Sequence, residues 1–128
     1  MPGRVITALL AVLVLTAGCN PSKEVALGAK DSGRQIEVKK GEPLIITLEA
    51  NPTTGYLWEV VESGQRILRQ MGETEFQPES DKIGAPGLQT FRFEAQEKGD
   101  VTLELVYRRP WEKDVDPLET FSLQVTVR

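Results

Sequence analysis

The sequence predicts an all-β protein, either a sandwich or a barrel, built from about six to eight antiparallel strands. Short segments in which apolar and polar residues alternate recur along the chain, and turns rich in Gly, Pro and Asp separate them. No segment of about ten or more residues combines a helical period with capping residues. The chain has 128 residues, of which 40% are hydrophobic, so it is long enough for one domain with its own core.

The predicted strands follow one another along the chain, and each has one apolar face. Turns at residues 40–43 and 97–100 separate neighbouring strands, and residues 67–76, where the alternation is weaker, hold one or two short strands. Burial of the apolar faces must hold the domain together, because a single cysteine cannot close a disulfide within the chain. The core-facing positions are Ile36, Val38, Leu44, Ile46, Leu48, Tyr56, Trp58, Val60, Phe91, Phe93, Ala95, Val101, Leu103, Leu105, Tyr107, Phe121, Leu123, Val125 and Val127.

The composition excludes most classes of enzyme. The chain has no histidine, which rules out Ser-His and Cys-His nucleophilic catalysis and every histidine-ligated metal site. One cysteine cannot supply a thiolate cage for zinc. Acidic residues number 19 against 15 Lys and Arg, with no basic cluster, so nucleic acid is not expected as a partner. The sequence therefore predicts no enzyme, no metal and no cofactor.

Residues 1–18 have the pattern of an export signal. Arg4 precedes an apolar run at residues 5–17, which is shorter than the roughly 20 residues that a membrane-spanning helix needs. The segment at residues 15–18, Leu-Thr-Ala-Gly, resembles a bacterial lipobox, although the usual Leu stands one place nearer the cysteine. This resemblance implies that Cys19 is diacylated and becomes the mature N-terminus. The alternatives are a plain secretory signal with an incidental cysteine, or a buried strand.

These features divide the chain into three parts. Residues 1–18 are a lipoprotein signal peptide, residues 19–33 are a lipidated N-terminus and tether rich in Pro, Ser, Gly, Lys and Asp, and residues 34–128 are the folded domain. Asn20 stands where an Asp would favour retention in the inner membrane, so the resemblance implies the outer membrane. We expect a protein of the cell envelope, anchored to the membrane through Cys19 and monomeric.

Two connections between predicted strands are rich in turn residues. The first reads Asn51-Pro52-Thr53-Thr54-Gly55-Tyr56, in which Pro fixes one φ and Gly allows a positive φ, so two hydroxyls stand at the tip of a stiff loop. The second reads Gly84-Ala85-Pro86-Gly87-Leu88 and lacks the pattern of a phosphate-binding loop. Taken alone, each is explained as an ordinary turn.

A third connection contains Arg109-Pro110-Trp111. Trp58 is in register with an apolar face and is expected in the core, whereas Trp111 lies among Arg, Pro, Glu and Lys in a long loop. An exposed Trp beside an Arg is typical of a binding hot spot. The alternative is a Trp that folds back over the edge of the sandwich.

In this order, the three segments resemble the chagasin-like inhibitors of papain-family cysteine peptidases. That family carries NPTTG followed by an aromatic residue, then a GxGG-type loop, then RPW. The first and third motifs are complete here, and Pro86 stands where the family has a glycine. The resemblance implies an immunoglobulin-like antiparallel β-sandwich of about seven or eight strands over residues 34–128. It also implies a reversible, tight-binding inhibitor that occludes the active-site cleft of a peptidase with three loops at one end of the sandwich.

The resemblance also implies a role for each loop. Thr53 and Thr54 would lie at the catalytic cysteine and histidine of the peptidase, residues 84–88 along the non-primed side of the cleft, and Arg109 and Trp111 on the primed side. In a sandwich, alternate connections emerge at the same end, which favours a shared tip for these loops. The rival hypothesis is a non-inhibitory envelope lipoprotein that binds an assembly partner or a cell-wall component.

Overall fold

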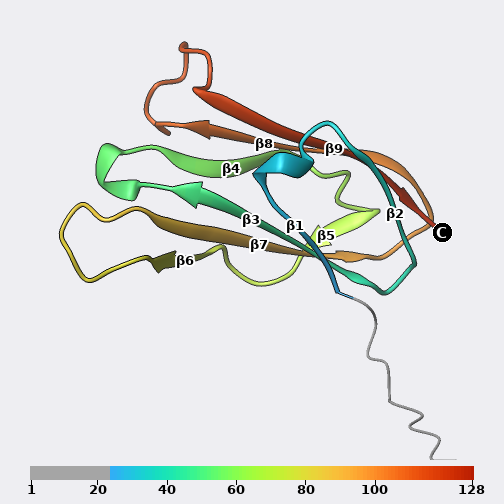
Figure 1. Cartoon of the computed structure of the whole chain (residues 1–128). Coiled ribbons are helices and arrows are strands. Elements are labelled where there is room, and N and C mark those ends of the chain that lie inside the picture. Colours follow the sequence, from blue (N-terminus) through green and yellow to red (C-terminus); the bar gives the residue numbers. More distant parts are fainter. Residues whose placement is uncertain (1–23) are drawn as a thin grey trace, which may run out of the picture.

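The alternating segments form two packed β-sheets in a computed structural model that describes residues 24–128 (Figure 1). The described part has nine strands and two short 3-10 turns, and none of it forms a helix long and apolar enough to span a membrane. The prediction of an all-β sandwich is confirmed. The elements are β1 (Val25–Leu27), η1 (Ala29–Asp31), β2 (Gln35–Val38), β3 (Pro43–Ala50), η2 (Pro52–Thr54), β4 (Leu57–Glu62), β5 (Leu68–Gln70), β6 (Glu75–Pro78), β7 (Gly87–Ala95), β8 (Gly99–Arg108) and β9 (Glu119–Val127).

The two sheets have different strand orders. The first sheet runs β1-β3-β7-β5, with β6 also paired to β7, and the second runs β2-β9-β8-β4. The weakly alternating residues 67–76 supply β5 and the start of β6, as expected. The expectation of purely antiparallel sheets is corrected, because β1 pairs with β3 and β2 pairs with β9 in parallel.

The parallel pairs arise because the N-terminal segment divides between the sheets. It adds β1 to the edge of the first sheet, crosses at η1 and adds β2 to the edge of the second. The folded domain therefore begins before residue 34, since residues 25–33, assigned to the tether on composition, are part of the sandwich. Val25 and Leu27 pack against the core, but a three-residue strand is too short to show an alternation. The predicted signal peptide and Cys19 lie outside the described residues.

The core lies between the sheets and is built mostly from the predicted alternating positions, which Ala50 and Leu68 join. Phe91, Phe93 and Phe121 are among its largest fully buried side chains, and Trp58 is buried as expected. Gln89 is a buried polar residue that joins the two sheets, since its amide accepts from Trp58 N at 2.9 Å and donates to Trp58 O at 3.2 Å. This link lies close to the strand ends that carry the predicted loops.

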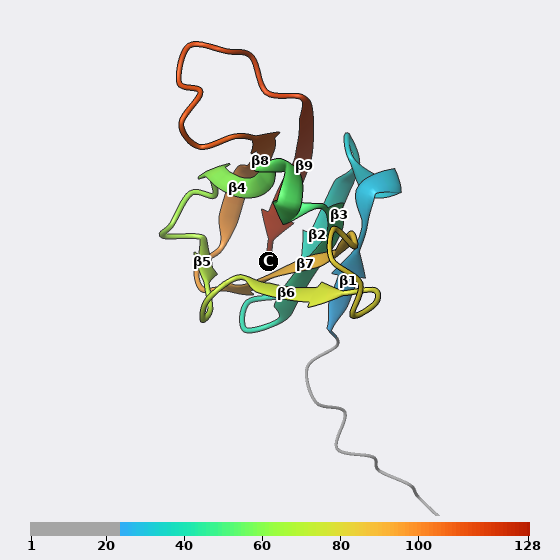
Figure 2. The same ribbon diagram turned by 90° about the vertical axis from the view of Figure 1, so that its left-hand side faces the viewer.

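Three of the strand connections emerge at the same end of the sandwich. Ala50 is opposite Gly87 in the first sheet, and Tyr107 is opposite both Trp58 and Glu119 in the second. The β3–β4, β6–β7 and β8–β9 connections therefore share one end, which lies on the left in Figure 1 and is seen end-on in Figure 2. We call residues 51–56, 79–86 and 109–118 the first, second and third loops, and this pole the loop end.

Candidate functional site: three interlocked loops

The first loop is a single 3-10 turn stabilised by its own side chains. Asn51 caps η2, and its Oδ1 accepts from the Thr53 amide at 3.2 Å and from the Thr53 hydroxyl at 2.5 Å. The Thr54 hydroxyl donates to Asn51 O at 2.6 Å, and Gly55, with φ of 88°, ends the turn in the left-handed region. The sequence therefore builds a loop whose backbone shape does not depend on a partner.

These contacts limit what the two threonines can offer to a partner. Both hydroxyl hydrogens are donated within the loop, although both side chains are exposed. Each hydroxyl oxygen keeps acceptor capacity, because a hydroxyl has one hydrogen and two lone pairs. The tip is therefore best suited to accept hydrogen bonds and to present backbone groups.

An aromatic column connects the first loop to the core. The Tyr56 ring stacks on Tyr107 with 5.4 Å between centroids, and Tyr107 lies against Trp58 at 5.1 Å. The Tyr107 hydroxyl also accepts a hydrogen bond from Asn51 N at 3.0 Å. The sequence identified Tyr107 only as a core residue and missed this second role, which depends on a contact across 56 positions of the chain.

The second loop joins β6 to β7 and contacts the first loop directly. Gly84 has φ of 85°, and its carbonyl accepts from the Asn51 side chain at 3.3 Å. Gly87 and Leu88, predicted in the loop, instead begin β7. A Cβ at Gly87 would lie 2.3 Å from Gln77 O, so the glycine allows β6 to approach closely.

The third loop packs its tryptophan against the first loop without burying it. Trp111 is 68% exposed, and a Cβ placed on Gly55 would be 2.4 Å from Cη2 of its ring. The indole therefore rests on the glycine and presents most of its surface to solvent. Arg109 donates from Nε to Thr54 O at 3.0 Å, and its guanidinium lies 4.5 Å from the centroid of Tyr56.

One exposed residue at the loop end was missed in the sequence. Ile83, in the second loop, is fully exposed, which is unusual for a branched apolar side chain. The sequence feature that could have indicated its exposure is its position as a lone isoleucine among Ser, Asp, Lys and Gly. Val115 and Leu118 in the third loop are also exposed, so the loop end carries several apolar side chains.

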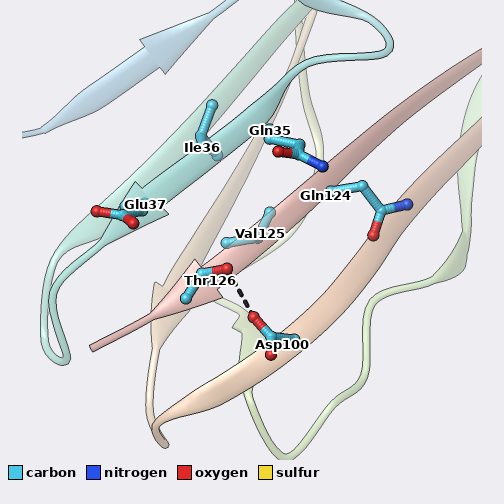
Figure 3. A pocket seen from close by; sticks show the side chains of 7 residues that line it. All are labelled: Gln35, Ile36, Glu37, Asp100, Gln124, Val125 and Thr126. Atoms are coloured by element: carbon cyan, nitrogen blue, oxygen red, sulfur yellow. Dashed lines mark hydrogen bonds between the residues drawn. The ribbon is translucent and has the colours of Figure 1, made fainter.

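A groove of about 500 Å³ lies elsewhere, along β2, β9 and β8 (Figure 3). In it, the Thr126 hydroxyl donates to Asp100 at 2.6 Å. None of the predicted binding residues contributes to this groove. Its lining residues are Gln35, Ile36, Glu37, Asp100, Gln124, Val125 and Thr126.

A β-sandwich that carries three loops at one end, the first bonded to each of the other two, together with an exposed indole, has the architecture of a protein that binds a groove of another protein. Comparisons with known proteins support the same class of protein. Residues 37–125 match the chagasin family of peptidase inhibitors, I42, and the chain belongs to this family. The predicted class, an inhibitor of cysteine peptidases and not an enzyme, is confirmed.

Individual relatives are similar over most of their length. The chain is 32% identical to Amoebiasin-1 of Entamoeba histolytica, with 81% of this chain and all of the relative covered. It is 30% identical to chagasin of Trypanosoma cruzi, over 72% of this chain and 87% of the relative. The crystal structure of a cysteine protease inhibitor from Entamoeba histolytica is similar with a TM-score of 0.73 and 25% identity, over 82% of this chain and 96% of that one.

Proposed function

We propose that the chain inhibits papain-family cysteine peptidases reversibly and tightly, by inserting its loop end into the active-site cleft. The observation that carries this proposal is the direct bonding of the first loop to both neighbours, through Asn51 to Gly84 and through Arg109 to Thr54. Loops that are fixed before binding lose little conformational entropy on association. An interface of ordinary size, about 800 Å² per partner, can then give tight binding.

In the proposed complex, the first loop covers the catalytic groups of the peptidase. The exposed Thr53 and Thr54 lie at the tip, held there by the Asn51 cap and the left-handed Gly55. With the loop in place, the nucleophile of the peptidase cannot reach a peptide carbonyl in attacking geometry. Inhibition then needs no reaction of the inhibitor itself.

The other two loops supply contacts on either side of the first. Residues 84–88 line the non-primed side, where the exposed Leu88 and the neighbouring Ile83 offer apolar surface. Pro86 gives this loop less freedom than the glycine of the family motif, because proline fixes its φ. Trp111 packs on the primed side, where its large exposed surface suits a hot spot.

The same proposal includes export and anchoring. Residues 1–18 act as a signal peptide, and a lipid on Cys19 holds the protein to the cell envelope, at the outer membrane. The support is the sequence pattern before Cys19. The fold is compatible with it, because Val25 at the start of β1 is paired with Leu44, near the end of the sandwich that is opposite the three loops.

Titration of papain with the domain that lacks residues 1–19 tests the proposed inhibition. We expect a stoichiometric end point for the unmodified domain and a clear loss of affinity for the variant that combines Thr54→Ala with Trp111→Ala. The melting temperature should change little, since both side chains are exposed and neither belongs to the core. Removing a hot-spot tryptophan typically costs about 2 kcal/mol or more of binding free energy.

The same titration distinguishes the proposed inhibitor from the rival hypothesis. A non-inhibitory envelope lipoprotein that uses these loops for an assembly partner or a cell-wall component would give no end point with papain or with other members of that peptidase family. Unfolding of the double variant would instead show that the loop residues are structural.

A further inference from the structure

The side chain of Arg109 is occupied by contacts within the protein. Its Nε donates to Thr54 O at 3.0 Å, and its guanidinium carbon lies 4.5 Å from the centroid of the Tyr56 ring. A third contact, an ion pair with Glu112 at 3.7 Å, ties it to its own loop. The Arg109 side chain is 37% exposed, so it is partly covered by these contacts.

These contacts make Arg109 the hydrogen-bonded link between the first and third loops. Within residues 24–128, its bond to Thr54 O is the one hydrogen bond that joins residues 51–56 to residues 109–118. It reaches the last position of η2, next to the left-handed Gly55. The Arg109 guanidinium also makes a cation–π contact with Tyr56, at the outer end of the aromatic column that Tyr56 forms with Tyr107 and Trp58.

We propose that Arg109 is a positioning residue, which holds the first loop in its binding conformation and does not itself form a main contact with the peptidase. This inference rests on the proposed function, and it changes the role that the family resemblance implies for Arg109. Trp111 then supplies the contact surface of the RPW segment, while Arg109 sets the shape of the neighbouring loop. The first and third loops bind as one unit because of this side chain.

A positioning role has a kinetic signature that differs from that of a direct contact. If the free loop samples other conformations, only a fraction of the molecules can bind, and the apparent affinity falls by that fraction. The loss then appears mainly in the association rate constant. Removing one partner of a buried, hydrogen-bonded charge pair in the complex instead acts mainly on the dissociation rate constant.

The experiment compares Arg109→Gln with Arg108→Gln in the full-length protein purified in detergent. Arg108 is the matched control, because it is the adjacent arginine and is paired with Glu59 on β4, not with the first loop. The measurements are the association and dissociation rate constants with papain, and amide hydrogen exchange of the free protein at Thr54 and Gly55. Both amides donate to carbonyls of the same turn, at 3.1 and 2.9 Å.

For Arg109→Gln we expect association about tenfold slower, dissociation nearly unchanged, and exchange about tenfold faster at Thr54 and Gly55. Arg108→Gln, which removes the same charge, should change none of these by more than about twofold. Arg109→Lys should not restore the association rate, because an ammonium keeps the charge but lacks the planar Nε donor. Recovery by lysine would overturn the proposal in favour of electrostatic steering.

Faster dissociation of Arg109→Gln with unchanged exchange would also overturn the proposal and make Arg109 a direct contact. The exchange measurement needs no peptidase. If the unmodified protein failed to inhibit papain, the proposed function would fail, while unchanged exchange in Arg109→Gln would refute the positioning role separately.

Discussion

Gly55 and the indole of Trp111 are packed closely against each other at the loop end. The glycine has φ of 88°, and a methyl group there would overlap the indole, at 2.4 Å from Cη2. The residue therefore meets two demands: it ends the 3-10 turn in the left-handed region, and it leaves room for the tryptophan. Gly41, in the turn between β2 and β3, has a similar φ of 92°, but a methyl group there would meet no atom of residues 24–128 within 4 Å.

Replacing each glycine by alanine separates backbone strain from the packing of the indole. Both variants should lose about 1–2 kcal/mol of folding free energy, because a left-handed residue with a Cβ is strained. Gly55→Ala should in addition displace Trp111 and weaken papain inhibition about tenfold or more, whereas Gly41→Ala should inhibit normally. Melting curves and inhibition constants measure the two effects. Equal inhibition by both variants would show that the indole position does not matter for binding.

Among the elements, the crossing of the N-terminal segment between the sheets depends on Asp31. This buried carboxylate accepts from Gly28 N at 2.8 Å and from Arg34 at 2.6 Å, which fixes the turn that joins β1 to β2. The hydrogen bond from the Gly28 backbone and the neighbouring Arg34 guanidinium hold the pKa of Asp31 below its ordinary value. The folded protein therefore favours the ionised form.

The lowered pKa has a defined consequence for stability. The contribution of the Asp31 carboxylate is complete above the unfolded pKa, about 3.9, and is lost as the pH falls through the lower pKa of the folded state. We expect Asp31→Asn to melt at a lower temperature than the unmodified protein at pH 7, with a difference that closes as the pH falls below about 4. Asp114→Asn, in the exposed third loop, is the control and should show no such difference. If the difference in melting temperature between Asp31→Asn and the unmodified protein did not change with pH, the stabilising role of the Asp31 charge would be contradicted.

Over the whole molecule, the loops and the start of the described chain point to opposite ends. Val25 pairs with Leu44 near the start of β3. From Leu44, β3 continues for six residues, a length of about 20 Å, to Ala50 at the base of the first loop. In the sequence, Cys19 stands six positions before Val25, a reach of at most about 20 Å. We therefore predict that a protein held at Cys19 presents its loops away from the membrane and still inhibits.

Coupling to lipid vesicles tests this arrangement independently of natural acylation. Cys19 is the single cysteine, so the chain without residues 1–18 can be coupled there to maleimide lipids. We expect the coupled protein to titrate papain with the same end point as the free protein. In the control, Cys19→Ser with Lys113→Cys, the attachment lies in the exposed third loop and should block inhibition. Loss of inhibition on coupling through Cys19 would contradict the predicted orientation.

Local patterns in the chain are enough to establish the class of fold, the core and the family. Alternation with period two identifies a buried face without knowledge of the partner strand, which is why Phe91, Phe93 and Phe121 could be assigned to the core. The NPTTGY and RPW segments are local strings, and their turn chemistry is encoded in the same few residues. The first strand was missed, because its three residues stand in a segment rich in Pro, Ser, Gly, Lys and Asp, a composition that favours a tether.

The way in which the loops depend on one another becomes visible only in three dimensions. The bond from Asn51 to Gly84 crosses 33 positions, and the bond from Arg109 to Thr54 crosses 55. The resting place of Trp111 on Gly55 likewise joins distant parts of the chain. A hydrogen bond or a packing contact requires both groups within a few ångströms, and a local pattern does not specify which distant residue arrives there. The pairing of β3 with β7 and of β4 with β8 brings these groups together.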